Sequence, residues 1–342
     1  MRFARAGARP QLRPARIRPG SALLLAAATA ASLAAGCQGP GRGGGGPQVP
    51  ITVAAIRGVD NAPLYFGVRN GTFARAGLDV TIRQFGSVPQ ELTALSNGSA
   101  DIAAGDYVDF FYQVSKSSHP FLRIIADGYH AAPGMIEVLT YPGSGITSPQ
   151  GLVHRTVGTP PSQGIPVGSG RPYSTETLAA QSVLTNDGVD PTQVKWRPMP
   201  TAALIGALAA HRVAAILVPE PYIFEAETSI GAIPVLDAAS GATASLPLSG
   251  YFATASFIRQ HAQAVADFQA ALEQAQADAA LATPVRSELA TQPGMTRQAA
   301  ELITLGDYPT SLNVGSIARV ASLMFNFEML TPAINVSSLV VR

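Results

Sequence analysis

The sequence predicts an α/β protein built from mixed, mainly parallel sheets flanked by helices. From Ile51 onward, short apolar runs alternate with amphipathic segments of helical length, and turn pairs such as Asn70-Gly71 separate them. Strands interleaved with helices of about 10–15 residues are typical of βαβ units, whose strands pair in parallel. The composition is 47% hydrophobic and 13% charged over 342 residues, which suits a globular chain with room for two domains.

The first part of the chain begins with a β-rich run, and each helix after it has a recognisable start. Asp60 or Asn61 precedes Pro63 at one helix start, and Ser87 precedes Gln90 in a capping-box pattern at the next. The predicted strands are 51–56, 78–85, 101–105, 121–126 and 135–141.

After residue 141 the composition becomes rich in glycine, serine and proline, which indicates that the chain passes into a second group of strands and helices. Its predicted strands are 156–158, 195–199, 213–218 and 232–236, and the chain returns near 246–254. The C-terminal part is predicted to be helical at 257–282, 296–305 and 315–330.

The first 36 residues are typical of a removable targeting segment. Six arginines and no acidic residue precede an apolar run, 21–35, that is shorter than a membrane-spanning helix. The run leads into Leu-Ala-Ala-Gly-Cys, in which Cys37 is the single cysteine of the chain. This ending resembles a bacterial lipobox, which implies cleavage before Cys37 and a lipid on its sulfur; a plain secretory signal is the alternative. Residues 37–47 then fit a flexible tether.

Charge and motif content exclude several classes of function. Without residues 1–36 the chain has 17 basic and 22 acidic residues, a formal charge of −5. Proteins that bind nucleic acids usually carry an excess of basic residues, so this charge argues against nucleic-acid binding. A lone cysteine forms no disulfide framework, and the five histidines lack zinc-site spacing. No Gly-x-Ser-x-Gly elbow is present. We therefore expect no catalytic residues, no metal and no cofactor.

Three blocks of the sequence resemble the NMT1/THI5-like, nitrate/sulfonate/taurine-type solute-binding proteins of ABC importers. The first is residues 62–106, which contain APLYFGVRNGTFARAGLDV and LSNGSADIAAGD. The second is GLVHRTVGT with ALIGALAAHRVAAILVPEPY, at 151–159 and 203–222, and the third follows Ser249. His211 and Ala214 stand where the family pattern has Gly and Asp, and the loop 160–173 carries no family ligand signature, which leaves the ligand open.

The resemblance implies a two-lobed, type II periplasmic-binding-protein-like fold with a hinge between the lobes. Lobe 1 would comprise residues 48–141 and 247–342, and lobe 2 residues 142–246. In such folds ligands lie beyond the carboxyl ends of parallel strands, where helix N-termini supply free N–H groups.

Residues at these strand ends and helix starts are the candidate ligand contacts implied by the resemblance. Each also has a purely structural interpretation, such as a helix cap for Asp106 or a surface loop for 160–173. The candidates are Asn61, Ala62, Ser87, Asp106, Tyr107, Ser162, Ser174, Glu220 and Tyr222.

The resemblance therefore implies an extracytoplasmic, lipid-anchored, monomeric receptor. It would capture a small organic solute, such as a sulfonate, nitrate or a thiamine-precursor pyrimidine, and deliver it to an ABC permease and its ATPase. One alternative is a ligand-sensing lipoprotein that feeds a signalling partner. The other is an enzyme of the same fold that makes a pyrimidine precursor; the Cys-rich motif of those relatives is absent here.

Overall fold

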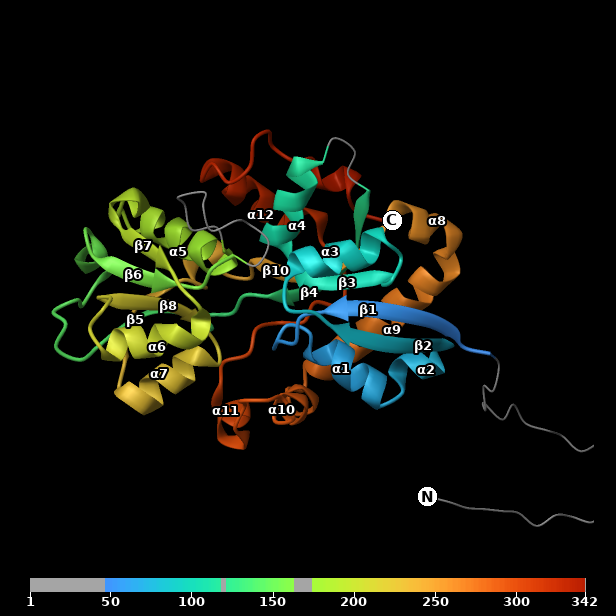
Figure 1. Cartoon of the computed structure of the whole chain (residues 1–342), viewed down its shortest axis with the longest axis horizontal. Helices are drawn as coiled ribbons and strands as arrows, with labels where there is room; N and C mark the ends of the chain where they lie inside the picture. Colours follow the sequence, from blue (N-terminus) through green and yellow to red (C-terminus); the bar gives the residue numbers. More distant parts are fainter. Residues whose placement is uncertain (1–46, 118–120, 163–173, 342) are drawn as a thin grey trace, which may run out of the picture. The chain divides into compact units, whose positions relative to one another are not determined.

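Two five-stranded sheets organise the chain (Figure 1). The computed structural model describes residues 47–117, 121–162 and 174–341. The predicted signal segment and Cys37, and most of the loop 160–173, lie outside these described residues. No helix of the described part is long and apolar enough to cross a membrane.

The first sheet has the strand order β2-β1-β3-β10-β4. β1 pairs in parallel with β2 and β3, and β10 is antiparallel to β3 and β4. The strands are β1 (Val49–Ala55), β2 (Leu78–Gln84), β3 (Ile102–Asp106), β4 (Leu122–His130) and β10 (Pro247–Thr254).

The second sheet repeats this plan with the order β7-β6-β8-β5-β9. β6 pairs in parallel with β7 and β8, and β5 is antiparallel to β8 and β9. The strands are β5 (Ile136–Thr140), β6 (Thr156–Thr159), β7 (Lys195–Pro198), β8 (Ala215–Pro219) and β9 (Ile233–Asp237).

Each sheet is mixed because it contains a strand that the chain brings from the other sheet. The chain leaves the first sheet after β4 to form β5, and it leaves the second after β9 to form β10. The predicted mixed, mainly parallel sheets are therefore confirmed, with β5 and β10 as the antiparallel strands. Since β5 pairs in the second sheet, a division by sheets falls before residue 136 and not after 141. We call residues 47–130 with 247–341 the first half, and residues 136–237 the second half.

Both faces of the second sheet are buried, and successive residues of its strands pack on opposite faces. In β8, Ile216 and Val218 pack with α6 and α7 in one apolar cluster, while Leu217 faces a cluster that includes Leu178 of α5. The helices that precede β9 in the chain are α1 (Ala62–Arg69), α2 (Thr72–Arg75), α3 (Val88–Ser96), α4 (Tyr107–Lys116), α5 (Thr175–Asn186), α6 (Thr201–Ala209) and α7 (Tyr222–Ile230).

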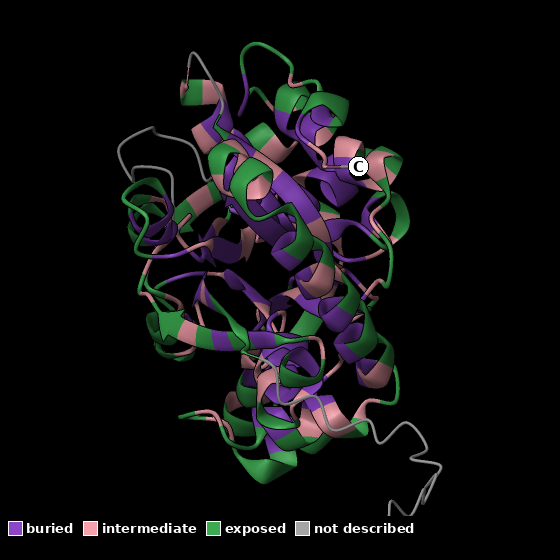
Figure 2. Cartoon of the chain, turned by 90° about the vertical axis from the view of Figure 1, so that its right-hand side faces the viewer, coloured by how far each residue is buried: buried purple, intermediate pink, exposed green. Residues whose placement is uncertain are grey.

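The C-terminal helices pack against the sheets and link the two halves. Met324 of α12 belongs to the same buried cluster as Phe111 of α4 and Leu178 of α5. Buried residues lie mainly in the interior strands and on the inner faces of the helices (Figure 2). The predicted helix 257–282 is interrupted at His261. The C-terminal helices are α8 (Ala255–Gln260), α9 (Ala262–Ala279), α10 (Thr283–Leu289), α11 (Arg297–Leu302) and α12 (Val314–Asn326).

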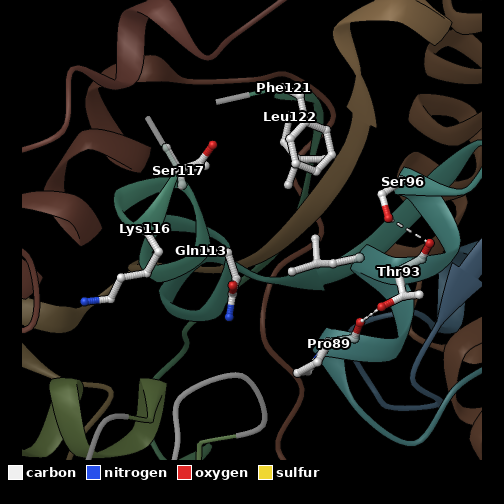
Figure 3. Close-up of a pocket in the computed structure, with 10 residues that line it drawn as sticks. Pro89, Thr93, Ser96, Gln113, Lys116, Ser117, Phe121 and Leu122 are labelled. Carbon is white, nitrogen blue, oxygen red and sulfur yellow. Dashed lines mark hydrogen bonds between the residues drawn. The ribbon is translucent and has the colours of Figure 1, made fainter. Parts of the chain in front are cut away.

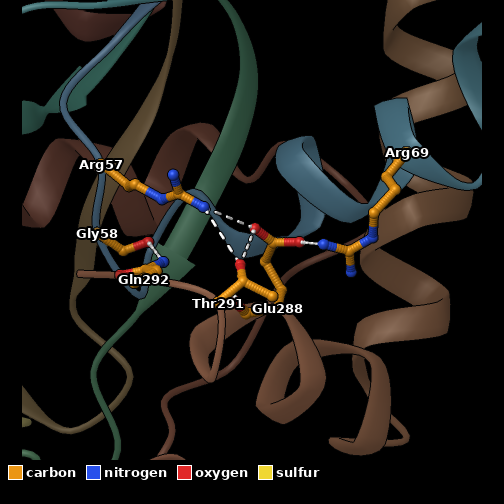
Figure 4. A network of polar contacts seen from close by, with 6 residues as sticks. All are labelled: Arg57, Gly58, Arg69, Glu288, Thr291 and Gln292. Atoms are coloured by element: carbon orange, nitrogen blue, oxygen red, sulfur yellow. Dashed lines mark hydrogen bonds and ion pairs between the residues drawn. The ribbon is translucent and has the colours of Figure 1, made fainter. Parts of the chain in front are cut away.

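A buried glutamate fixes α10 to the loop after β1 and to α1 (Figure 4). The carboxylate of Glu288, 1% exposed, pairs through Oε1 with Arg57 Nη2 at 3.2 Å and through Oε2 with Arg69. Arg57 also lies over the ring of Tyr65, 4.9 Å from its centroid. The guanidinium of Arg57 is thereby held toward α10.

Candidate binding site

Hydrogen bonds join the two halves where β3 ends and α4 begins. Asp106 ends β3 and caps α4, because its Oδ1 accepts from the backbone N–H of Val108 at 2.6 Å. Its Oδ2 accepts from the hydroxyl of Thr175, the first residue of α5. One turn along α4, Asp109 Oδ1 accepts from the hydroxyl of Ser162 at 2.7 Å. The predicted residues Asp106 and Ser162 thus each take part in one of the hydrogen bonds that join the halves.

Carboxyl groups gather at this junction from separate elements of the first half. Glu91 of α3 is 1% exposed, and burial raises its pKa to about 8, with the charges of Asp60 and Asp109 adding to the effect. Burial raises the pKa of Asp60 to about 6, although a hydrogen bond from Ser249 works in the opposite direction. Burial, followed by the charge of Asp109, raises the pKa of Asp106 as well. The junction is therefore rich in acids that are hard to ionise together.

Four tyrosines lie within the electrostatic reach of Asp60. After burial, which is the main cause, the charge of Asp60 helps to raise the pKa of Tyr65, Tyr129, Tyr251 and Tyr308. The rings of Tyr129 and Tyr308 are 4.8 Å apart, and the Tyr308 hydroxyl donates to the carbonyl of Val59 at 2.6 Å. Aromatic side chains therefore lie near the carboxyl group of Asp60.

Three of the other predicted residues have structural roles in the first half. Asn61 donates from Nδ2 to the carbonyl of Ile56 at 2.9 Å, which holds the turn before α1, and Ala62 is fully buried. Tyr107 is 0% exposed, and its hydroxyl donates to Asp127 at 3.0 Å inside the core. Its predicted exposure to a site is not seen.

The four remaining predicted residues lie at or near the starts of helices. Ser87 starts α3 half-buried, and its side chain makes no capping hydrogen bond. Ser174 caps α5 in a capping box with Thr177. Glu220 accepts from the backbone N–H of Thr304 at 3.0 Å, and Tyr222 begins α7 beside an apolar cluster. These four residues do not join the hydrogen bonds of Asp106 and Asp109 that the described chain shows.

Asp60, Glu91, Asp109 and Thr175 are not among the nine candidate residues predicted from the sequence. Charged helix residues such as Glu91 are usually solvent-exposed, so composition gave no sign of its burial. One signal was available: Asp109 follows Asp106 by three residues, which places both on one side of α4.

Two surface hollows lie away from this junction. One of about 490 Å³ is lined by residues of α3 and α4, including Gln113 and Lys116, and by Phe121 (Figure 3). A neighbouring hollow of about 480 Å³ also includes Phe121. None of the nine predicted residues lines either hollow.

The two mixed sheets with their crossing strands define the periplasmic-binding-protein fold, which solved structures share. No curated protein matches the sequence significantly. The profile described as the NMT1-like family matches residues 44–292, and the chain belongs to this family.

Solved structures with this fold differ in what they bind or do. A ligand-binding component of an ABC-type import system from Staphylococcus aureus, with zinc bound, is 14% identical, with a TM-score of 0.68 over 86% of this chain and 97% of that chain. The alkanesulfonate-binding protein SsuA from Xanthomonas axonopodis pv. citri, bound to MOPS, has the same identity and TM-score over 87% and 99%. The desulfurization enzyme DSZB is 15% identical, with a TM-score of 0.65 over 85% and 96%. At these identities the likeness shows the fold alone.

Proposed function

We propose that this protein is the extracytoplasmic solute-binding component of an ABC importer. It captures a small organic solute between its two halves and delivers the solute to a permease with its ATPase. Family membership and the fold shared with import components support this role.

The observation that carries the proposal is the pair of hydrogen bonds between the halves, Thr175 to Asp106 and Ser162 to Asp109. They lie at the carboxyl end of β3 and the N-terminus of α5, where α/β folds bind ligands. A solute held there touches both halves and so stabilises the closed form over an open one, with the two connections 131–135 and 238–246 as the hinge. The lobes of this clamp are the two halves defined by the sheets.

A thermal-shift screen tests solute binding directly. A ligand that binds only the folded protein raises Tm, and the gain in stability grows with the logarithm of the ratio of its concentration to Kd. The screen takes sulfonates, nitrate, pyrimidines and organic amines. A concentration-dependent rise in Tm with at least one compound is expected, and no rise with any of them contradicts the proposal.

Attachment to the membrane through a lipid on Cys37 completes the proposed role. Replacement Cys37→Ser is expected to move the protein from the membrane fraction to the soluble fraction and to abolish labelling with radioactive palmitate. Unchanged fractionation of the variant contradicts the anchor. We propose that the protein acts as a monomer.

An enzymatic role is the second candidate, because a desulfurization enzyme has the same fold. Incubation of the protein with each stabilising compound, followed by mass spectrometry of the compound, separates the two roles. A receptor returns the compound unchanged, whereas a new product assigns catalysis.

A further inference from the structure

Glu91 is a buried carboxyl group that the described chain leaves partly without a partner. It is 1% exposed, yet its Oε1 has no hydrogen-bond partner among the described residues. The backbone of Ile56 gives the carboxyl group one hydrogen bond, and Oε2 lies 3.4 Å from where a Cβ on Gly105 would stand, beside Asp106. Buried carboxyl groups are normally paired, so an oxygen left open at the junction indicates a missing partner.

The charges around Glu91 define what that partner must be. The loop before α1 contributes Asp60 and α4 contributes Asp109, both acidic. Across the described residues, neither Glu91 nor Asp60 forms an ion pair with a basic side chain. The nearby cation Arg57 is paired with Glu288 instead. An anionic solute meets repulsion here, whereas a cation meets the opposite charge.

The tyrosines near Asp60 indicate a second property of the solute. The charge of Asp60 acts on Tyr65, Tyr129, Tyr251 and Tyr308, and the hydroxyl of Tyr65 is a further buried polar atom near this carboxyl group. Aromatic rings attract organic cations through their faces, and a hydroxyl offers a hydrogen bond to a polar group. Carboxyl groups beside aromatic rings therefore fit an organic cation with N–H donors.

We propose that Glu91 and Asp60 bind a positively charged nitrogen of the solute, so that this receptor takes organic cations rather than sulfonates or nitrate. This inference rests on the proposed solute-binding function. Because Glu91 is mostly protonated at neutral pH without solute, binding of the cation releases the proton of its carboxyl group to the solvent. Affinity therefore increases as pH rises from 6 to 8, by up to about tenfold per pH unit.

Matched pairs of compounds test the inference by thermal shift at pH 6 and pH 8. The pairs are benzylammonium with benzenesulfonate and propylammonium with propanesulfonate, alongside agmatine, nitrate, and the chlorides of magnesium, calcium and zinc. The ammonium members and agmatine are expected to raise Tm, more at pH 8 than at pH 6. Titration calorimetry in two buffers of different ionisation enthalpy is expected to show proton release.

Variants assign the effect to the two carboxyl groups. Glu91→Gln and Asp60→Asn are each expected to weaken binding of the best cation at least tenfold. The same change at the exposed Glu273, Glu273→Gln, is expected to leave binding unchanged. Binding of sulfonates, nitrate or metal ions without binding of amines overturns this inference but leaves the receptor proposal standing. Binding of no compound contradicts the receptor proposal itself, and cation binding unaffected by both variants overturns the assigned site.

Discussion

Replacement of Glu91 with glutamine is expected to flatten the pH dependence of folding stability. The carboxyl group has an ordinary pKa of 4.5 in the unfolded chain and a pKa of about 8 in the folded protein. Between these values the unfolded state ionises while the folded state keeps its proton, so stability falls as pH rises. The full contribution is present below pH 4.5 and is lost by about pH 8.

The size of this effect follows from the width of that interval. It spans about 3.5 pH units between 4.5 and about 8, and each is worth about 1.4 kcal/mol, which gives an upper bound of about 5 kcal/mol. Glutamine resembles the protonated acid and cannot ionise. The variant is therefore expected to be more stable than the parent at pH 8, by up to that amount, and nearly equal to it at pH 4.5.

Urea unfolding followed by circular dichroism at pH 5, 6, 7 and 8 measures the difference. The slope of unfolding free energy against pH is expected to be less negative in the variant by about 1.4 kcal/mol per pH unit. Parallel slopes for parent and variant would show that Glu91 ionises normally. That result would refute the conclusion that its carboxyl group is buried without a partner. Glu273→Gln, an exposed change, serves as the control with an unaltered slope.

Three further substitutions test the packing and the junction. Thr175→Val removes the hydroxyl that bonds Asp106 and is expected to weaken solute binding about fivefold by calorimetry, which corresponds to about 1 kcal/mol; an unchanged Kd speaks against a role in closure. Glu288→Gln breaks the ion pairs with Arg57 and Arg69 and is expected to lower the free energy of unfolding in urea by about 2 kcal/mol. Equal unfolding midpoints for parent and variant would show that these ion pairs do not stabilise the position of α10. Phe268→Ala, at a fully buried ring, is expected to cost about 3–5 kcal/mol, and a loss below about 1 kcal/mol would show a looser core.

Local sequence pattern predicted the elements well because their periodicity depends on neighbours in the chain. The strands 51–56, 78–85 and 101–105 coincide with β1, β2 and β3 to within a few residues. Mixed sheets were predicted, but the identity of the antiparallel strands β5 and β10 was not, since it results from the chain crossing between sheets, which no local pattern encodes.

The site was predicted only in part, because burial depends on contacts between distant residues. Asp106 follows a strand and begins a helix, and that local signal led to a residue at the junction. Tyr107, its neighbour, enters the core because Gly250 leaves room: a Cβ there would lie 2.5 Å from the Tyr107 hydroxyl oxygen. The environment of Glu91 is set by Asp60 and Asp109 on other elements, so only the fold reveals it.

The distance between the two halves, measured with and without solute, tests the clamp most directly. Spin labels at Ser96→Cys on α3 and Thr185→Cys on α5, both exposed positions, report this distance in a Cys37→Ser background. With the solute that raises Tm most, closure of the two halves is expected to give a narrower distance distribution centred at a shorter value. A distribution that this bound solute leaves unchanged would contradict capture by closure of the two halves.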